Sequence, residues 1–199
     1  MSRRKIKFDF RWLLLFLLLA GAMAGGLYWC FYTGIITSEL KIVNDRKYDK
    51  QISAAARKHG IPVALLRAVI RRESRFRADM VGKKGEIGLM QVLPSGAAAD
   101  WARVHKKKRP SDFELFDVKT NLEIGCWFLA RALKRWKNYR YGTELALAEY
   151  NAGLTNARRW APADRNARVI DRITFDSTRE YVTVIMRYYR QELEKKTLR

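Results

Sequence analysis

Apolar residues recur every three or four positions along most of this chain, which is the spacing of one face of an α-helix. The pattern predicts a final helix that begins near Ser177 and earlier helices over about 48–59, 62–73, 95–104, 120–136, 143–152 and 165–173. No segment alternates apolar and polar residues strongly enough to predict a strand. The expected fold class is therefore all-α, with one domain of ordinary size.

The helix that starts near Pro62 carries a carboxylate on its apolar face. The stripe formed by Leu66, Val69 and Ile70, continued by three or four residues, reaches Glu73. Burial among apolar side chains disfavours the charged form of a carboxyl and raises its pKa, and a general acid near neutral pH needs that protonated form. An ordinary ion pair with a neighbouring arginine is the alternative interpretation of the same spacing.

Three short blocks in the chain occur in a recognisable order. Glu73-Ser74 is followed by the run GLMQ at 88–91, after a loop whose glycines indicate backbone that passes close to a neighbour or a ligand, and then by EYNAG at 149–153. In this order they resemble the signatures of the soluble lytic transglycosylase catalytic domain, which has a lysozyme-like fold. The run STREYV at 177–182 is similar to a late segment of the same family. The resemblance covers the chain from about Tyr48 to Leu193, and four ordered blocks are far more specific than any one of them.

The resemblance implies a peptidoglycan lytic transglycosylase that cleaves the β-1,4 bond between MurNAc and GlcNAc and leaves a 1,6-anhydromuramoyl end. Glu73 is then the catalytic residue, which first protonates the leaving oxygen and later takes the proton from O6, while the N-acetyl group of the glycan stabilises the cationic centre. No cofactor is implied. The residues expected to bind substrate are Ser74, Gly88, Leu89, Met90, Gln91, Tyr150, Asn151 and Tyr181.

The chemistry of these side chains suits a sugar substrate. The amides of Gln91 and Asn151 can form hydrogen bonds with hydroxyl or acetamido groups, Met90 and Tyr150 can form an apolar wall, and Tyr181 is expected to bring a hydroxyl close to the acid. At two other positions the chain departs from the family. Ala78 and Gly82 stand where the family usually has a proline and a serine, and that serine is expected to help shape the cleft.

The N-terminal region predicts a membrane anchor. Residues 1–11 form a basic tail, and no charged residue occurs from Trp12 to Thr37, so that 12–36 is long enough to span a bilayer as one helix. The basic tail predicts a cytoplasmic N-terminus, a single pass through the inner membrane, and a linker at 37–47 leading to a domain at 48–199 outside the cytoplasm. A cleaved signal peptide ending near Ala20-Gly21-Ala22 is the alternative.

Composition narrows the choice of partners. The 199 residues carry a net charge of +20, which suits an anionic partner. Nucleic acid is disfavoured because the predicted span exports the domain and no nucleic-acid motif accompanies the charge, so peptidoglycan glycan strands are the expected partner, together with the membrane at the anchor. Cys30 and Cys126 lack the His or Cys companions of a metal site, and no metal is expected. Oligomeric state is not predicted.

Two other functions fit the same residues. The first is a hydrolase of goose-lysozyme type, in which Asp79 or Glu86 orders a water molecule for attack on the sugar. The second is a non-catalytic envelope protein that keeps the fold in order to bind peptidoglycan. An intact Glu73 favours an enzyme over this scaffold.

Overall fold

The structure is a computed structural model that describes residues 21–33 and 46–197. The chain forms two compact units, Met1–Asn44 and Asp45–Arg199. In the first unit, residues 21–33 are helical. The predicted basic tail, both ends of the predicted span and most of the linker lie outside the described residues. Within the described ranges, no helix is both long and apolar enough to cross a bilayer.

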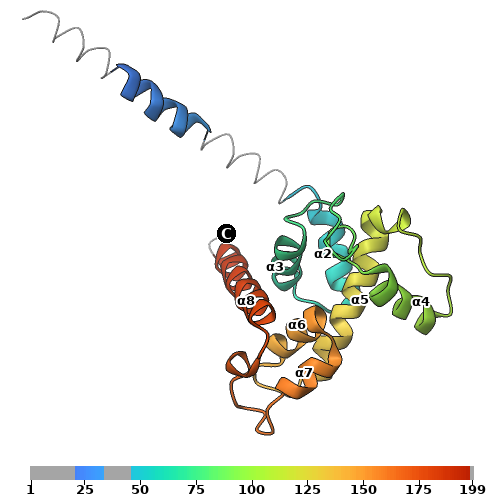
Figure 1. The fold of residues 1–199 in the computed structure, drawn as a ribbon. Coiled ribbons are helices and arrows are strands. Elements are labelled where there is room, and N and C mark those ends of the chain that lie inside the picture. The colour runs from blue at the N-terminus through green and yellow to red at the C-terminus, as the bar shows by residue number, and fades with distance from the viewer. Residues whose placement is uncertain (1–20, 34–45, 198–199) are drawn as a thin grey trace, which may run out of the picture. The chain divides into compact units, whose positions relative to one another are not determined.

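The second unit is built from seven α-helices among its described residues (Figure 1). They are α2 (Asp49–His59), α3 (Val63–Glu73), α4 (Ala99–His105), α5 (Val118–Trp136), α6 (Gly142–Ala152), α7 (Leu154–Trp160) and α8 (Asp176–Thr197). Three short turns join them: η1 (Pro94–Ala98), which is π-helical, and the 3₁₀ turns η2 (Glu114–Phe116) and η3 (Ile170–Arg172). The all-α fold class is confirmed, since extended pairing among the described residues is limited to isolated bridges of Ile87 with Val81 and Val92.

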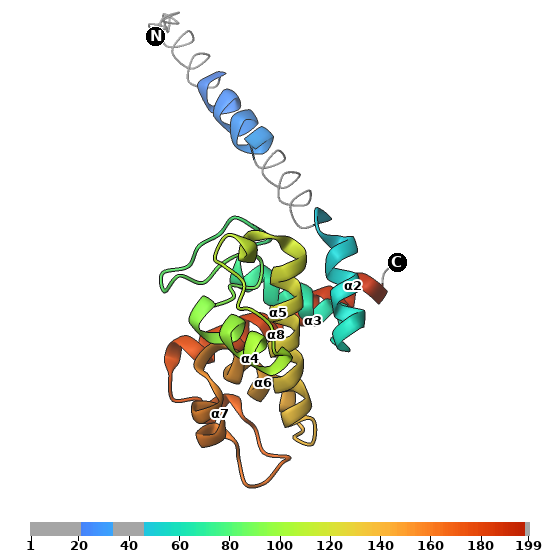
Figure 2. The ribbon, with the colours of Figure 1, turned by 90° about the vertical axis from the view of Figure 1, so that its right-hand side faces the viewer.

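Helix α5 is the centre of this unit. It packs against α2, α4, α6, η1 and η2. Figure 2 shows α2, α4 and α6 beside it. Its inward face repeats at helical spacing, with Leu122, Cys126 and Leu129 fully or almost fully buried. Helix α8 joins this core through α3 and α6, so the core forms a single cluster that extends from Tyr48 to Ile185.

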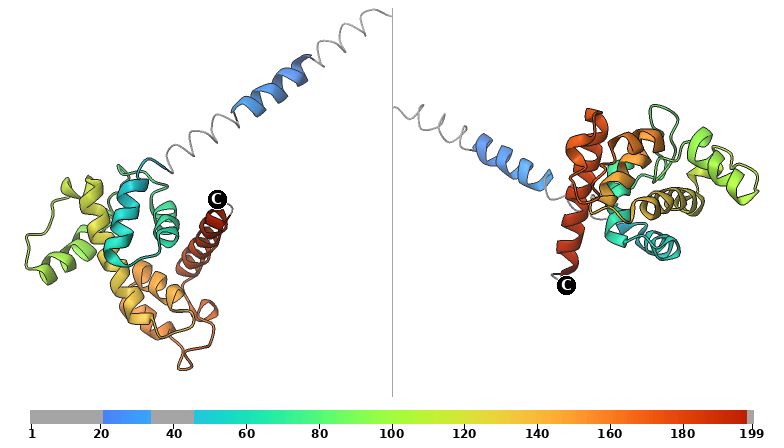
Figure 3. Two further views of the ribbon diagram at one scale, coloured as in Figure 1. Left: turned by 180° about the vertical axis from the view of Figure 1, so that it is seen from behind. Right: turned by 90° about the horizontal axis from the view of Figure 1, so that it is seen from below.

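The last helix packs back onto the first part of the unit. Helix α8 lies along α3 and also contacts α6 (Figure 3). Its buried positions Tyr181, Val182 and Ile185 follow helical spacing and face this core. Residues from the beginning and the end of the domain are thereby brought to one place.

Helix α7 was not among the predicted helices, and three further details of the helices differ from the sequence predictions. Helix α5 begins at Val118 and not at Thr120, because the carboxylate of Asp117 accepts the backbone N–H of Thr120 and caps the helix. The helix predicted over 165–173 is only the turn η3. Helix α8 starts at Asp176, so Ser177 lies within its first turn and does not precede it.

Candidate active site

Glu73 is the last residue of α3, and its side chain is only partly buried. The helix ends there because the chain turns sharply, with Arg75 at φ 53° and Phe76 at φ 61°, both in the left-handed region. That conformation costs about 1–2 kcal/mol for a residue with a side chain, and the burial of Phe76, which is 3% exposed, offsets this cost. The carboxyl therefore sits at the edge of the core, where it remains accessible.

The surroundings of Glu73 keep its carboxyl about half protonated near neutral pH. Burial raises its pKa from 4.5 to about 7, and the negative charge of Glu86 acts in the same direction. The hydroxyl of Tyr181, which donates a hydrogen bond to Oε1, and the positive charge of Arg72 oppose this rise without cancelling it. A partly buried carboxyl with such a pKa can deliver a proton and take one back at the same pH.

Ser74 supports the site from inside the protein. Its side chain has no exposed surface, and its hydroxyl donates to the carbonyl oxygen of Leu89 at 2.9 Å, with the carbonyl of Ile70 at 3.3 Å. Leu89 is also fully buried. The bond from Ser74 ties the end of α3 to the GLMQ run at 88–91. Because the side chains of Ser74 and Leu89 are both buried, they support this region from the core and do not line a cleft.

A buried amide holds the GLMQ turn in place. Asn121 of α5, which is 1% exposed, accepts the backbone N–H of Met90 at 2.9 Å and donates to the carbonyl oxygens of Ile87 at 2.7 Å and Leu115 at 2.8 Å. Gly88 has φ +77°, and a Cβ on it would lie 2.4 Å from Nδ2 of Asn121. Glycine is therefore required at position 88 by both the backbone conformation and the close approach of the amide.

Met90 and Tyr150 are brought together, although in a different way from the one expected. The hydroxyl of Tyr150 donates to the carbonyl oxygen of Met90 at 2.8 Å. Met90 itself has no exposed surface, so its thioether packs in the core and does not form a wall of a cleft. Tyr150 is partly exposed, and its ring meets Phe128 edge to face, with the centroids 5.6 Å apart.

The two amides expected to contact sugar have different environments. Gln91, at φ 48°, donates from Nε2 to the carbonyl oxygens of Gly88 at 3.0 Å and Met80 at 3.2 Å, so its nitrogen closes the turn. Asn151 is exposed, and its Oδ1 accepts the hydroxyl of the buried Thr178 at 2.8 Å. The side chain of Asn151 is thus held at the surface by a hydrogen bond from α8, while the amide nitrogen of Gln91 is already bonded to carbonyl oxygens of its own loop.

Position 82 shows how the chain accommodates its departure from the family pattern. A Cβ on Gly82 would lie 2.4 Å from Oε2 of Glu86 and 2.6 Å from Oε1 of Gln91. The backbone N–H of Gly82 donates to the carbonyl oxygen of Glu86 at 2.7 Å. Glu86 and Gln91 thus pack closely against the place where a serine side chain would begin.

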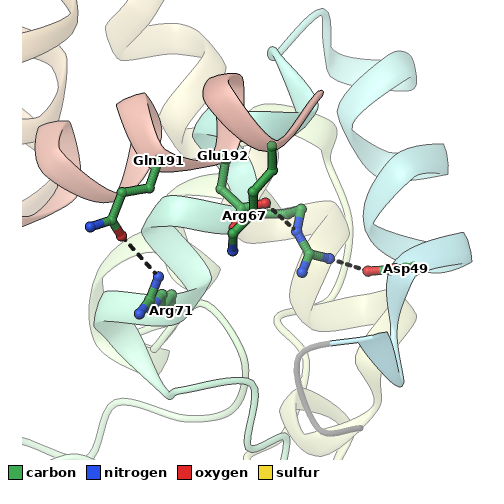
Figure 4. Close-up of polar contacts among 6 residues, drawn as sticks. Asp49, Arg67, Arg71, Gln191 and Glu192 are labelled. Atoms are coloured by element: carbon green, nitrogen blue, oxygen red, sulfur yellow. Dashed lines mark hydrogen bonds and ion pairs between the residues drawn. The ribbon is translucent and has the colours of Figure 1, made fainter. Parts of the chain in front are cut away.

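An ion-pair network fastens α8 to the helix that carries Glu73 (Figure 4). Arg67 of α3 donates from Nε to Glu192 of α8 at 2.9 Å and also pairs with Asp49 of α2. One turn along α3, Arg71 donates to the side-chain oxygen of Gln191 at 3.3 Å. Because Tyr181 belongs to α8, these contacts help to determine where its hydroxyl lies relative to Glu73.

Sequence reasoning did not identify Asn121, Thr178 or the network around Arg67. A signal for Asn121 was present, since it is a polar residue at helical spacing within a buried apolar stripe. No comparable signal marks Arg67, which is one of many arginines in a basic chain. Among the described residues, no group of three or more His, Cys, Asp or Glu side chains could hold a metal ion.

The sequence of this chain is similar to those of known lytic transglycosylases. The model of the family described as the transglycosylase SLT domain matches residues 50–171. The chain is 30% identical over 150 residues to the membrane-bound lytic murein transglycosylase C of Mannheimia succiniciproducens, over 72% of this chain and 38% of that protein. It is 33% identical over 92 residues to the membrane-bound lytic murein transglycosylase E of Buchnera aphidicola, over 46% of this chain and 42% of that protein.

A solved structure shares the fold. An inactive mutant of the lytic transglycosylase Slt from Pseudomonas aeruginosa superposes with a TM-score of 0.66 and 26% identity, over 76% of this chain and 25% of that one. The chain thus spans about two fifths of the length of the two curated relatives and a quarter of the solved protein. Helix α8, with Tyr181, lies beyond the end of the family match.

Proposed function

The chain belongs to the transglycosylase SLT domain family, and on that premise we propose that it is a lytic murein transglycosylase. It cleaves the β-1,4 bond between MurNAc and GlcNAc in peptidoglycan and leaves a 1,6-anhydromuramoyl end. The observation that carries this proposal is the partly buried carboxyl of Glu73, whose pKa is raised to about 7. A proton donor that is half ionised near neutral pH can act as both acid and base.

The proposed reaction uses one carboxyl twice. Glu73 first gives its proton to the bridging oxygen, the bond from C1 of MurNAc to that oxygen breaks, and the N-acetyl group of the same sugar stabilises the cationic centre. The O6 hydroxyl then bonds to C1, and its proton returns to the Glu73 carboxylate. The proton count balances without water, and the enzyme ends in the state in which it began.

Residues around Glu73 have supporting roles in this proposal. Tyr181 orients the carboxyl through its hydrogen bond, and Asn151, which is exposed at the end of α6, is the amide best placed to contact the sugar. Tyr150 offers a partly exposed ring for an apolar face of the glycan. We assign the remaining predicted residues mainly to holding the turn at 88–91, whose Met90 carbonyl accepts the hydroxyl of Tyr150. These residues are Ser74, Gly88, Leu89, Met90 and Gln91.

Mass analysis of digested peptidoglycan tests the reaction. Purified sacculi are incubated with residues 45–199, which include the complete core, and the released muropeptides are weighed. We expect products that carry an anhydro end. Glu73→Gln should lower the rate by a factor of about 100 to 10,000, whereas Glu194→Gln, which changes an exposed carboxylate at the far end of α8, should leave it unchanged. Normal release by Glu73→Gln would overturn the assignment.

A hydrolase remains the second candidate because of Glu86. Its charge contributes to the raised pKa of Glu73, so a second carboxylate lies within electrostatic reach of the acid. Its Oε2 accepts the backbone N–H of Lys84 at 2.9 Å, which fixes its position, while Asp79 is exposed. If water is the nucleophile, Glu86→Gln should abolish cleavage and the normal products should carry reducing ends. If O6 is the nucleophile, the variant should still form anhydro ends.

We also propose that the N-terminal segment anchors the domain in the inner membrane by a single pass, with the domain outside the cytoplasm. In the helix over 21–33 the apolar side chains of Met23, Leu27, Tyr28, Trp29 and Phe31 are 67–70% exposed. A helix that is apolar on all sides favours lipid over water. The protein should stay with membranes after a high-salt wash. Release by salt, or a mature N-terminus near Gly25, would contradict an anchor.

A further inference from the structure

The loop that follows α4 carries an exposed run of positive charge. Residues 106–113, named here the basic loop, contain Lys106, Lys107, Lys108 and Arg109 against one acid, Asp112. All five are exposed, and within the described part of the chain none of the four basic residues forms an ion pair. Lys107 lies over the ring of Trp101, with Nζ 5.3 Å from the centroid, and the charge of Lys108 acts on Glu114. All four basic side chains nevertheless remain exposed, so a partner outside the domain can reach their charge.

The same loop presents an apolar side chain to solvent. Phe113 is 86% exposed, the highest value among the large apolar residues that the structure describes. Two residues further on, by contrast, the side chain of Leu115 is fully buried in the core. An exposed phenylalanine by itself is ordinary, but one that follows a run of four exposed cations combines two of the features that bind a membrane surface.

Local hydrogen bonds hold Phe113 in this outward position. The backbone N–H and the hydroxyl of Ser111 both donate to Oε2 of Glu114 at 2.8 Å, and the backbone N–H of Glu114 donates back to the Ser111 hydroxyl at 3.3 Å. This reciprocal pair is a capping box, with Phe113 inside it. The ring is thus presented by an ordered turn that is anchored by Leu115, so little conformational entropy is lost when it inserts into a partner.

We propose that the basic loop binds the surface of an anionic lipid bilayer, with its cations against the headgroup phosphates and the ring of Phe113 in the interfacial layer. A Lys or Arg near such a surface strengthens binding about fivefold, and a Phe side chain transferred out of water adds about tenfold. These contributions give weak, reversible contact. Weak contact is sufficient if the domain is tethered nearby, because the tether supplies a high effective concentration.

The phenylalanine is the reason to favour a bilayer over the anionic groups of the cell wall. Both would attract four cations, but a bilayer offers a continuous apolar layer into which a ring that is 86% exposed can insert, whereas a glycan strand offers only the separate apolar faces of its sugars. Free phosphate would likewise pair with the cations and make no contact with the ring of Phe113. The contribution of Phe113 therefore separates a lipid surface from the other anionic partners, and it does not depend on the catalytic role of Glu73.

Co-sedimentation of residues 45–199 with lipid vesicles tests this proposal. The probes are vesicles that contain phosphatidylglycerol, vesicles of phosphatidylcholine alone, and purified sacculi. We expect binding to the anionic vesicles that weakens as salt is raised. Phe113→Ala should weaken it about tenfold and Phe113→Trp should restore it. Lys106→Gln with Lys108→Gln should weaken it by more than tenfold at low salt.

Matched changes elsewhere serve as controls. Phe175→Ala removes another exposed phenylalanine, which is 48% exposed, and Lys83→Gln with Lys84→Gln removes the same charge from another exposed loop. Both should change vesicle binding less than twofold. The proposal is overturned if the loop variants and these controls bind alike, if inorganic phosphate displaces the vesicles at equal ionic strength, or if the loop variants lose sacculus binding and keep vesicle binding.

Discussion

The hydroxyl of Tyr181 donates a hydrogen bond to Oε1 of Glu73, although 108 residues separate the two along the chain. The pair joins the end of α3 to the first half of α8, which lies outside the segment matched by the family model. A phenol that donates to a carboxylate stabilises its charged form. Tyr181 therefore limits the rise in pKa that burial causes at Glu73 and keeps the carboxyl close to half ionised near neutral pH.

Stability should depend on pH through Glu73. Its pKa is about 7 in the folded protein against 4.5 for an ordinary glutamate, so between these values the folded state binds more protons and becomes less stable as pH rises. Glu73→Gln removes this penalty. The variant should match the wild type below about pH 4.5 and exceed it by up to about 3 kcal/mol above about pH 7, less to the extent that solvent screens the partly exposed carboxyl. Denaturant unfolding across this range measures the difference, and a difference independent of pH would contradict the raised pKa.

Removing the Tyr181 hydroxyl should shift the alkaline limb of the pH–rate profile to higher pH. Because that hydroxyl lowers the pKa of Glu73, Tyr181→Phe raises it further, and the alkaline limb of kcat/KM should shift to higher pH by roughly one unit. Tyr188→Phe is the control, since this ring packs on the guanidinium of Arg71 at 4.0 Å and loses only its hydroxyl. A limb that stays in place in Tyr181→Phe would show that the hydrogen bond does not tune the acid.

Substitution of two glycines in one loop distinguishes the cost of backbone strain from the cost of a steric clash. Gly85 has φ +81° and open space where a Cβ would stand, whereas at Gly88, with φ +77°, a Cβ would meet Nδ2 of Asn121 at 2.4 Å. Gly85→Ala should cost about 1–2 kcal/mol from backbone strain alone. Gly88→Ala should cost about 2 kcal/mol more and should lose activity, because Asn121 must move. Equal losses of unfolding free energy would show that the Asn121 amide does not constrain position 88.

The ion pair of Arg67 with Glu192, near the C-terminal end of α8, should influence the pKa of Glu73, which Tyr181 contacts from the N-terminal half of the same helix. Arg67 and Glu192 are 15% and 14% exposed, so Arg67→Met leaves a poorly solvated carboxylate and should destabilise the domain by about 2 kcal/mol. If α8 shifts, the alkaline limb should move in the same direction as in Tyr181→Phe, and Arg67→Lys should restore part of it.

The control for this network is Arg103→Met. Arg103 pairs with Asp100 on the surface, where the arginine is 71% exposed, and its loss should change stability by less than about 0.5 kcal/mol. Hydrogen exchange in α8 provides an independent measurement. Protection of α8 that is unchanged in Arg67→Met would mean that apolar contacts with α3 hold the helix without help from the ion pairs.

Local rules were sufficient to predict most of the helices and the burial of the apolar stripe that leads to Glu73. Gly60 ends α2 in a left-handed cap at φ 65°, and the apolar stripe that leads to Glu73 is buried as its spacing requires. These features depend on residues within one or two turns of each other, so they can be recognised in a linear sequence. The helix over 165–173 was wrongly predicted, since only Ile170–Arg172 form a turn. Its apolar residues Val169 and Ile173 are buried in the core, but an irregular segment buries them as well as a helix would.

The sequence by itself therefore determined the all-α class, the place of Glu73 at the end of a buried apolar stripe and the residues that mark the family. Only the tertiary structure decided that Ser74 and Met90 face inward, that Asn121 supports the turn, and that Arg67 holds the helix of Tyr181. The physical reason is that burial and hydrogen-bond partners at these positions come from residues distant in the chain. Asn121 bonds Met90 across 31 residues and Arg67 bonds Glu192 across 125, and no periodicity along the sequence encodes such pairings.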